Sequence, residues 1–248
     1  MRGVVAAVAA VAAAASWPVA ASPRAALPLA GEVVVIDPGH NNGNFSHPDE
    51  INRRVNAGTL YKECDTTGTA TASGYTEATY NYDVALRVKR ILRRAGAHVH
   101  LTRTASRPAW GPCITERAAF GNRLHADAAI SIHADGGPSS GRGFHVIYPS
   151  WVRGYTDDIY ADSYRLALDV RNAYLARSGM PYSNYVGSHG LNQRSDLGGL
   201  NLSNVPKVFI ETGNMRNETD ARLLTSAAWR ERAAAAIARG ISTFLRRR

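Results

Sequence analysis

Short apolar runs alternate with amphipathic stretches along this chain, and that alternation limits its possible folds more than any other feature. The runs are rich in valine, isoleucine and alanine and cover residues 31–36, 99–102, 128–133, 144–148 and 205–211. Between them, apolar residues recur every three or four positions over residues 76–95, 114–125, 157–177 and 229–245. Alternating strands and helices predict one α/β domain over residues 31–248, with a mostly parallel, twisted sheet of about six strands and helices on both faces.

One polar segment interrupts this alternation directly after the first predicted strand. Residues 41–74 are rich in glycine and threonine and contain no long apolar run. Because a loop of this length inside a domain is usually functional, we expect an insert beside the active site. Within it, residues 59–63 and 69–71 flank Asp65-Thr66-Thr67-Gly68, which predicts a β-hairpin.

The first 21 residues have the order of a secretory signal peptide. A positive start, Met1-Arg2-Gly3, precedes an apolar run over residues 4–15 and the small residues Val19-Ala20-Ala21. The run is shorter than the roughly 20 residues that cross a bilayer, and no other stretch predicts a transmembrane segment. We therefore expect export to the periplasm, the cell wall or the medium; the alternative is an uncleaved anchoring helix.

Positive charge is concentrated in the last helix. The chain carries a formal net charge of +9, and residues 221–248 contain seven arginines against the single acidic residue Glu231. Nucleic-acid-binding proteins usually present a broad basic face, so we expect no nucleic-acid partner. The arginines are either a solvated helix face or a surface that attracts anionic wall polymers or lipid headgroups.

Three predicted strands end in residues that can carry chemistry. The first runs into Asp37-Pro38-Gly39-His40, the second into Ser131-Ile132-His133-Ala134-Asp135, and the third into Ile210-Glu211-Thr212-Gly213. The carboxyl ends of parallel strands share one edge of a sheet, where such folds hold ligands. Two imidazoles and a carboxylate are therefore expected to converge at that edge.

Glu77 adds a second carboxylate. It precedes Asn81 and Val84 by four and seven residues, so it lies on the inward face of its helix, where an unpaired carboxylate is costly. His40, Glu77 and His133 then form a His₂Glu set, which typically holds one zinc ion with a position open for water. Glu77 could instead only complement the helix dipole, and His47 and His189 remain competing ligands. His145 lies in the middle of a predicted strand and is given less weight as a ligand.

The motifs together resemble a known family. DPGH at 37–40, a glutamate opening the first long helix at 77, SIHAD at 131–135 and PKVFIETGNMRNETDARLL from Pro206 are similar to the zinc-dependent N-acetylmuramoyl-L-alanine amidases of the type-3 amidase fold. Their order and spacing match from Glu32 to Leu245. The insert at 41–74 also resembles that of exported, single-domain members.

This resemblance implies an activity and roles for four residues. Such enzymes cut the amide between the lactyl group of muramic acid and L-alanine in peptidoglycan or its soluble fragments. His40, Glu77 and His133 would bind Zn²⁺, one ion per chain, and Glu211 would be the catalytic glutamate of a monomer. A structural ion pair of Glu211 with Lys207 or Arg194 is the simpler alternative for that residue. A zinc exopeptidase and a non-catalytic wall-binding protein are the alternative functions.

The two cysteines, Cys64 and Cys113, allow one disulfide. In an exported protein we expect them to be bridged, which would fasten the insert beside the cleft. Two free thiols, or a thiolate zinc ligand, are the alternatives.

Overall fold

The structure is a computed structural model that describes residues 1, 3–7 and 27–248. The predicted signal peptide, residues 1–21, lies mostly outside the described residues. No helix in the described part of the chain is both long enough and apolar enough to cross a membrane.

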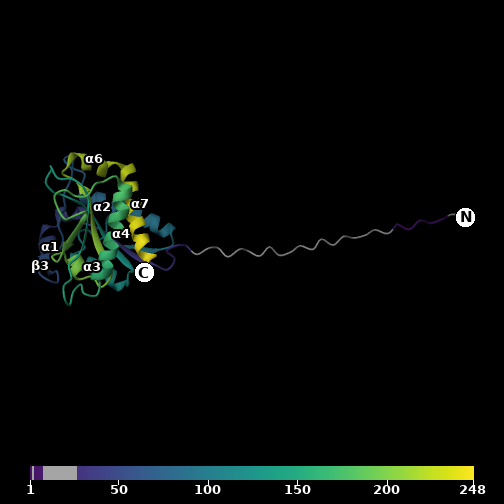
Figure 1. Cartoon of the computed structure of the whole chain (residues 1–248), viewed down its shortest axis with the longest axis horizontal. Helices are drawn as coiled ribbons and strands as arrows, with labels where there is room; N and C mark the ends of the chain where they lie inside the picture. Colours follow the sequence, from purple (N-terminus) through teal and green to yellow (C-terminus); the bar gives the residue numbers. More distant parts are fainter. Residues whose placement is uncertain (2, 8–26) are drawn as a thin grey trace.

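A six-stranded sheet forms the centre of the domain (Figure 1). Its strands are β1 (Val33–Pro38), β4 (His98–Leu101), β5 (Ala128–Asp135), β6 (His145–Pro149), β7 (Leu191–Arg194) and β8 (Lys207–Asn214), in the order β4-β1-β5-β8-β6-β7. Neighbouring strands are parallel except β6 and β8, which are antiparallel. The predicted α/β class is therefore confirmed.

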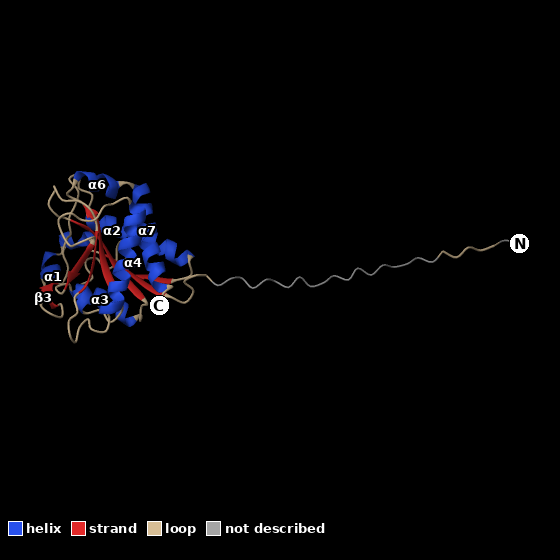
Figure 2. Ribbon diagram, in the orientation of Figure 1, coloured by secondary structure: helices blue, strands red, loops and turns tan. Residues whose placement is uncertain are grey.

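Helices cover both faces of this sheet (Figure 2). The main core lies between the sheet and the long helices α2 (Glu77–Arg94), α4 (Tyr160–Ser178) and α7 (Ala227–Leu245). A smaller core lies on the other face under α3 (Ile114–Arg123), which packs beside the short helix α5 (Gly198–Asn201). The helix α6 (Glu218–Thr225) precedes α7. The active-site candidates lie on the face covered by α3, α5 and the insert, or at its edge.

The position of α2 follows from its sequence. Thr76 is the N-cap and its hydroxyl accepts the Thr79 N–H, so Glu77 is the first helical residue. Val84, Val88 and Leu92 then fall on one buried stripe, and each is fully buried. The helix begins at the carboxyl edge of the sheet, where β1 and β5 also end, and this places Glu77 beside both strands.

The insert contains a hairpin, but the prediction that residues 59–63 pair with residues 69–71 was wrong. The structure pairs β2 (Arg54–Asn56) with β3 (Tyr61–Glu63), so the turn falls at residues 57–60 and not at 65–68. The Asn56 side chain accepts the Gly58 N–H inside that turn. The turn-like residues 65–68 fold over the active site instead, because Asp65 binds Arg117 and Thr66 binds His40. A short 3-10 helix (Asn42–Ser46) and α1 (Pro48–Asn52) form the first part of the insert, before the hairpin.

The cysteines form a disulfide, Cys64–Cys113, with a sequence separation of 49 residues. It joins Cys64, the residue after β3 within the insert, to Cys113, the residue before α3. The predicted pairing is confirmed, and a thiolate metal ligand is excluded because both sulfurs are used in the bridge.

Candidate active site

His40, Glu77 and His133 meet at the carboxyl edge of the sheet. One nitrogen of each imidazole and one Glu77 oxygen all lie within 4.8 Å of one another. His40 Nε2 lies 3.2 Å from Glu77 Oε2, and His133 Nδ1 lies 2.9 Å from Glu77 Oε1. Three residues that are far apart in sequence therefore form one compact donor set.

Two glycines make this approach possible. A Cβ atom at Gly39 would lie only 2.2 Å from the His133 ring, so the turn after β1 can pass that ring only without a side chain. Gly68 has a φ of +76°, and a Cβ there would lie 2.7 Å from both Glu77 Oε2 and the His40 ring. His40 itself adopts a left-handed φ of 56°, which turns its side chain toward Glu77.

The insert fixes the orientation of His40. His40 Nδ1 is placed to donate to the Thr66 carbonyl at 2.9 Å, so Nε2 faces Glu77. Burial by itself would lower the pKa of His40, but the Glu77 carboxylate and then Asp65 raise it, to about 8. A histidine whose second nitrogen is bound in this way is a common arrangement in metal sites.

Glu77 is almost completely buried and fully hydrogen-bonded. Its Oε2 accepts the Thr69 N–H, and its Oε1 accepts the Ala134 N–H. Burial alone would raise the pKa of Glu77, but the two flanking imidazoles hold it well below its usual range. The carboxylate is therefore kept ionised at the centre of the donor set.

These residues fit a zinc ion. Two imidazoles and one carboxylate are the ligands of many catalytic zinc sites, which keep a fourth position open. The competing histidines lie elsewhere: His47 is bonded to the Gly43 carbonyl, and His189 is exposed and contacts Ser188. Among the described residues, His40, Glu77 and His133 are the one group with the composition and spacing of a metal site.

Glu211 lies next to this set but outside it. It is the register partner of His133 on the neighbouring strand, so both side chains emerge on the same face of the sheet. Its Oε2 is buried and has no hydrogen-bond partner among the described residues. Burial raises the pKa of Glu211 well above its usual range, and the charges of Glu77 and Asp135 raise it further.

The alternative of a structural ion pair for Glu211 fails. Lys207 lies 3.9 Å from Asp37, and Arg194 binds Asp196 at 2.6 Å. The expectation that Glu211 ends its strand was also wrong, because β8 continues to Asn214. Glu211 is instead held inside a central strand, which fixes its position more firmly than a loop would.

His145 is a residue of this site that the sequence analysis set aside. It is the register partner of Glu211 on the antiparallel strand β6, and it is almost fully buried with its Nδ1 unpartnered among the described residues. Burial, opposed by Asp135 and assisted by Arg194, lowers the pKa of His145 to about 4. A neutral imidazole therefore lies directly opposite Glu211 on the same face of the sheet.

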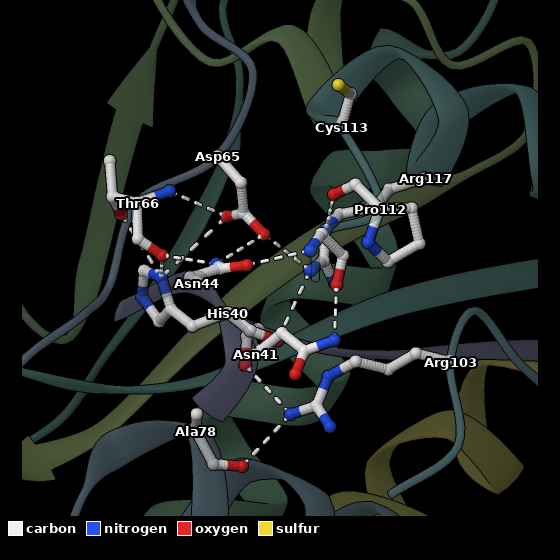
Figure 3. Close-up of polar contacts among 12 residues, drawn as sticks. His40, Asn41, Asn44, Asp65, Thr66, Ala78, Arg103, Pro112, Cys113 and Arg117 are labelled. Atoms are coloured by element: carbon white, nitrogen blue, oxygen red, sulfur yellow. Dashed lines mark hydrogen bonds and ion pairs between the residues drawn. The ribbon is translucent and has the colours of Figure 1, made fainter. Parts of the chain in front are cut away.

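A buried ionic network supports the turn that carries His40 (Figure 3). Arg117 donates to Asp37 at 2.7 Å and to Asp65 at 2.9 Å, and all three side chains are buried. Burial would raise the pKa of Asp37, but Arg117 and Lys207 hold it far below its usual range. Arg117 thereby ties the end of β1 to the insert.

Arg103 holds the same turn from the other side. Its guanidinium donates to the carbonyls of Pro38, Gly39 and Ala78 (Figure 3). These three carbonyls belong to the turn after β1 and the first turn of α2. Arg103 therefore couples the segments that carry His40 and Glu77.

A cavity of about 160 Å³ opens beside the two histidines. Its walls come from the insert, α3, α5 and β8, and include Lys62, Thr66, Ile114, Leu197 and Phe209. His133 stacks on Phe209 with ring centroids 5.5 Å apart. A substrate in this cavity would lie against the donor set.

An α/β domain that brings two imidazoles, a buried carboxylate and a second glutamate together beside a cavity has the make-up of a metal-assisted hydrolase. The family model for N-acetylmuramoyl-L-alanine amidases matches residues 34–243. An N-acetylmuramoyl-L-alanine amidase of Mycobacterium tuberculosis is 43% identical over 218 residues, which cover 88% of each chain. The chain belongs to this amidase family, as its motifs predicted.

Solved structures agree with this assignment. The N-acetylmuramyl-L-alanine amidase of Mycobacterium smegmatis superposes with a TM-score of 0.82 at 42% identity, over 89% of this chain and 99% of the other. The enzyme of Mycobacterium abscessus superposes with a TM-score of 0.80 at 40% identity, over 87% and 99% of the two chains. The similarity therefore covers nearly the whole length of these relatives.

Proposed function

We propose that this enzyme hydrolyses the amide between the lactyl group of N-acetylmuramic acid and L-alanine, in peptidoglycan or in its soluble fragments. The observation that carries the proposal is the carboxylate of Glu211, unpartnered among the described residues, beside the set His40, Glu77 and His133. Family membership and relatives named for this activity support the same substrate.

One zinc ion per chain would be held by His40, Glu77 and His133. When bound, zinc acidifies a bound water and polarises a carbonyl oxygen, which are the two requirements of amide hydrolysis. The protein keeps the ligands ready for it: Thr66 orients the His40 ring, and the N–H groups of Thr69 and Ala134 hold the Glu77 carboxylate.

Glu211 would move the protons. As a carboxylate it takes a proton from the water that attacks the lactyl carbonyl carbon. When the C–N bond breaks, it delivers that proton to the nitrogen of L-alanine, so the products are a lactyl carboxylic acid and a free amine. A raised pKa suits both steps, because the group must accept the proton and then release it near the working pH.

Glu211→Gln tests this role. The variant keeps the shape of the side chain but cannot accept a proton, so turnover should fall by at least about 100-fold while zinc content stays at that of the parent. Glu218→Gln, at an exposed position of α6, is the matched control and should retain full activity. Turnover in the Glu211→Gln variant equal to that of the control would refute the assignment.

The exopeptidase alternative differs in its product. An amidase releases an intact stem peptide that begins with L-alanine, whereas an exopeptidase releases a single amino acid. Mass analysis of the products from a defined muramyl peptide separates the two. A non-catalytic wall-binding protein would release neither product.

We also propose that the enzyme acts outside the cytoplasm, with residues 1–21 as an export signal and residues 31–248 as the catalytic domain. The apolar run at 4–15 and the disulfide support export. The N-terminal sequence of the protein recovered from the medium or cell envelope would test it: a start after residue 21 agrees, and an intact Met1 contradicts it.

A further inference from the structure

The outer surface of the long-helix layer carries a row of arginines. Along α7 and at the residue after it, one outward row consists of Ala228, Arg232, Ala235, Arg239, Ser242 and Arg246, so small side chains alternate with arginines. The three arginines are spaced seven residues apart. Seven residues make almost two helical turns, which aligns these guanidinium groups along one side of α7.

This row ends in a groove between α2 and α7. The groove encloses about 330 Å³, and its apolar walls include Ile91, Ala95 and Ala238. Three arginines surround it: Arg177 from α4, and Arg239 and Arg246 from α7 and its end.

The groove contains no neutralising charge. None of its lining residues is acidic, and none of its three arginines pairs with a carboxylate in the described part of the chain. Other basic residues nearby do pair, since Arg247 binds Asp169 and Arg248 binds Asp127. Arg246 donates its Nε–H to the Ser242 carbonyl, but the positive charges of the three groove arginines have no carboxylate partner among the described residues and can attract an external anion.

The end of α2 extends the positive surface. Lys89, Arg93 and Arg94 line a shallow depression on its last turns. Burial, and then the positive charge of Arg93, lower the pKa of Lys89. Because these like charges line one depression, a bound anion would offset the repulsion between them.

The groove and the active site lie at opposite ends of one helix. Glu77 is the first residue of α2, and Ile91 and Ala95 lie at its other end. At 1.5 Å per residue the 18-residue helix spans about 27 Å. Figure 1 accordingly shows the C-terminus and the end of α7 on the side of the domain away from α1 and β3. A large partner could occupy the groove without covering the cavity.

We propose that this basic groove docks the enzyme on a membrane surface rich in anionic phospholipid, with the active site facing away from the bilayer. Planar guanidinium groups bind phosphate oxygens in pairs, and several of them can share one headgroup. The apolar walls suit the glycerol and first acyl carbons below that phosphate, a contact that a purely polar polyanion would not use. Pro28 and Leu29, at the start of the domain, also line the groove.

Vesicle binding by the full chain tests the proposal. The test compares the parent, Arg177→Gln/Arg239→Gln/Arg246→Gln, and the control Arg107→Gln/Arg123→Gln/Arg153→Gln, which removes three exposed charges elsewhere. Each is sedimented with vesicles of phosphatidylglycerol and phosphatidylcholine, and with vesicles of phosphatidylcholine alone. The apolar N-terminal run is the same in all three proteins, so it contributes equally to each.

We expect the groove variant to bind the anionic vesicles about 100-fold more weakly than the parent, and the control to stay within a few-fold of it. Parental binding should weaken as salt is added. All three should hydrolyse a soluble muramyl peptide equally, which shows that each is folded. The proposal would be overturned if the control lost vesicle binding as much as the groove variant, or if the groove variant bound vesicles as tightly as the parent. It would also be overturned if the arginines bound an anionic wall polymer and not the vesicles.

Discussion

At the scale of single residues, the proposed zinc ligand His40 should make metal binding depend on pH. In the metal-free protein Glu77 raises the pKa of His40 to about 8, so below that pH a zinc ion must displace a proton from Nε2. The apparent zinc affinity should therefore weaken by up to about tenfold per pH unit below pH 8. Competition with a chelator of known affinity at several pH values measures this, with His189→Gln as a control that leaves the profile unchanged.

The stability of the metal-free protein should also depend on His40, but it should be greater at low pH, where the zinc affinity is weaker. A histidine whose pKa rises from 6.5 to about 8 on folding contributes stability that is complete below pH 6.5 and lost as the pH rises through 8. The contribution is roughly 2 kcal/mol.

A zinc affinity that does not change between pH 6.5 and 8 would contradict this account of His40.

Sequence reasoning predicted the three residues that the structure brings together because each lies in a short motif. His40 and His133 follow or end apolar strands, and Glu77 lies on an inward helix face. His145 was set aside because its relation to Glu211 exists only through the antiparallel pairing of β6 with β8. No local pattern encodes which strands become neighbours, so a histidine in a central strand has the same sequence signal whether it faces an apolar core or a buried glutamate.

At the scale of elements, the insert depends on its attachments. The disulfide joins two residues that are 49 positions apart in sequence. We expect this bridge to contribute about 4 kcal/mol to the free energy of unfolding. Cys64→Ser/Cys113→Ser should lose that stability and some activity, since Thr66 orients His40 from two residues beyond Cys64.

Thermal unfolding with and without reductant measures the effect of the bridge. The parent should become as unstable as the double variant when reduced, and the variant should not respond. Equal stability of the oxidised parent and the variant would contradict the expected role of the bridge.

Arg117 is the second attachment of the insert. Arg117→Met leaves Asp37 and Asp65 buried without their main counter-charge, which should cost about 3–5 kcal/mol. Urea unfolding at neutral pH measures the loss, and Arg123→Met, exposed on the same helix, should change stability by less than about 0.5 kcal/mol.

The pH dependence of that loss identifies its cause. Arg117 holds the pKa of Asp37 far below its usual range, so Asp37 contributes stability at pH values above its unfolded pKa, and this is lost only as the pH falls through the lower folded value. The difference in free energy of unfolding between parent and variant should thus narrow in acid, where Asp37 of the variant becomes neutral. A loss of stability that does not change with pH would show that the variant is destabilised by lost packing and not by the lost charge.

The hairpin error has a physical origin at this same scale. Asp65-Thr66-Thr67-Gly68 has the composition of a turn, but its polar groups bind partners far away in sequence. Asn44 donates to Asp65 and to the Thr66 carbonyl, and Arg117 binds Asp65 from α3. Tertiary contacts thus override the local turn preference.

At the scale of the whole molecule, the alternation of strands and helices was enough to predict the α/β class. It did not predict β7 (Leu191–Arg194), which contains one apolar residue, or α6, which is only eight residues long. It also could not reveal that β6 is reversed, because direction within a sheet depends on the connections between strands. The finished fold places the active site and the basic groove at the two ends of α2.

The central claim is that one zinc ion, held by His40, Glu77 and His133, supports cleavage of the bond to L-alanine beside Glu211. The most direct measurement combines metal analysis with product identification on a defined muramyl peptide, before and after exhaustive chelation. We predict one zinc per chain, an intact stem peptide with a free L-alanine amine, and loss of turnover on chelation that zinc restores. Full activity after complete removal of metal would contradict the account.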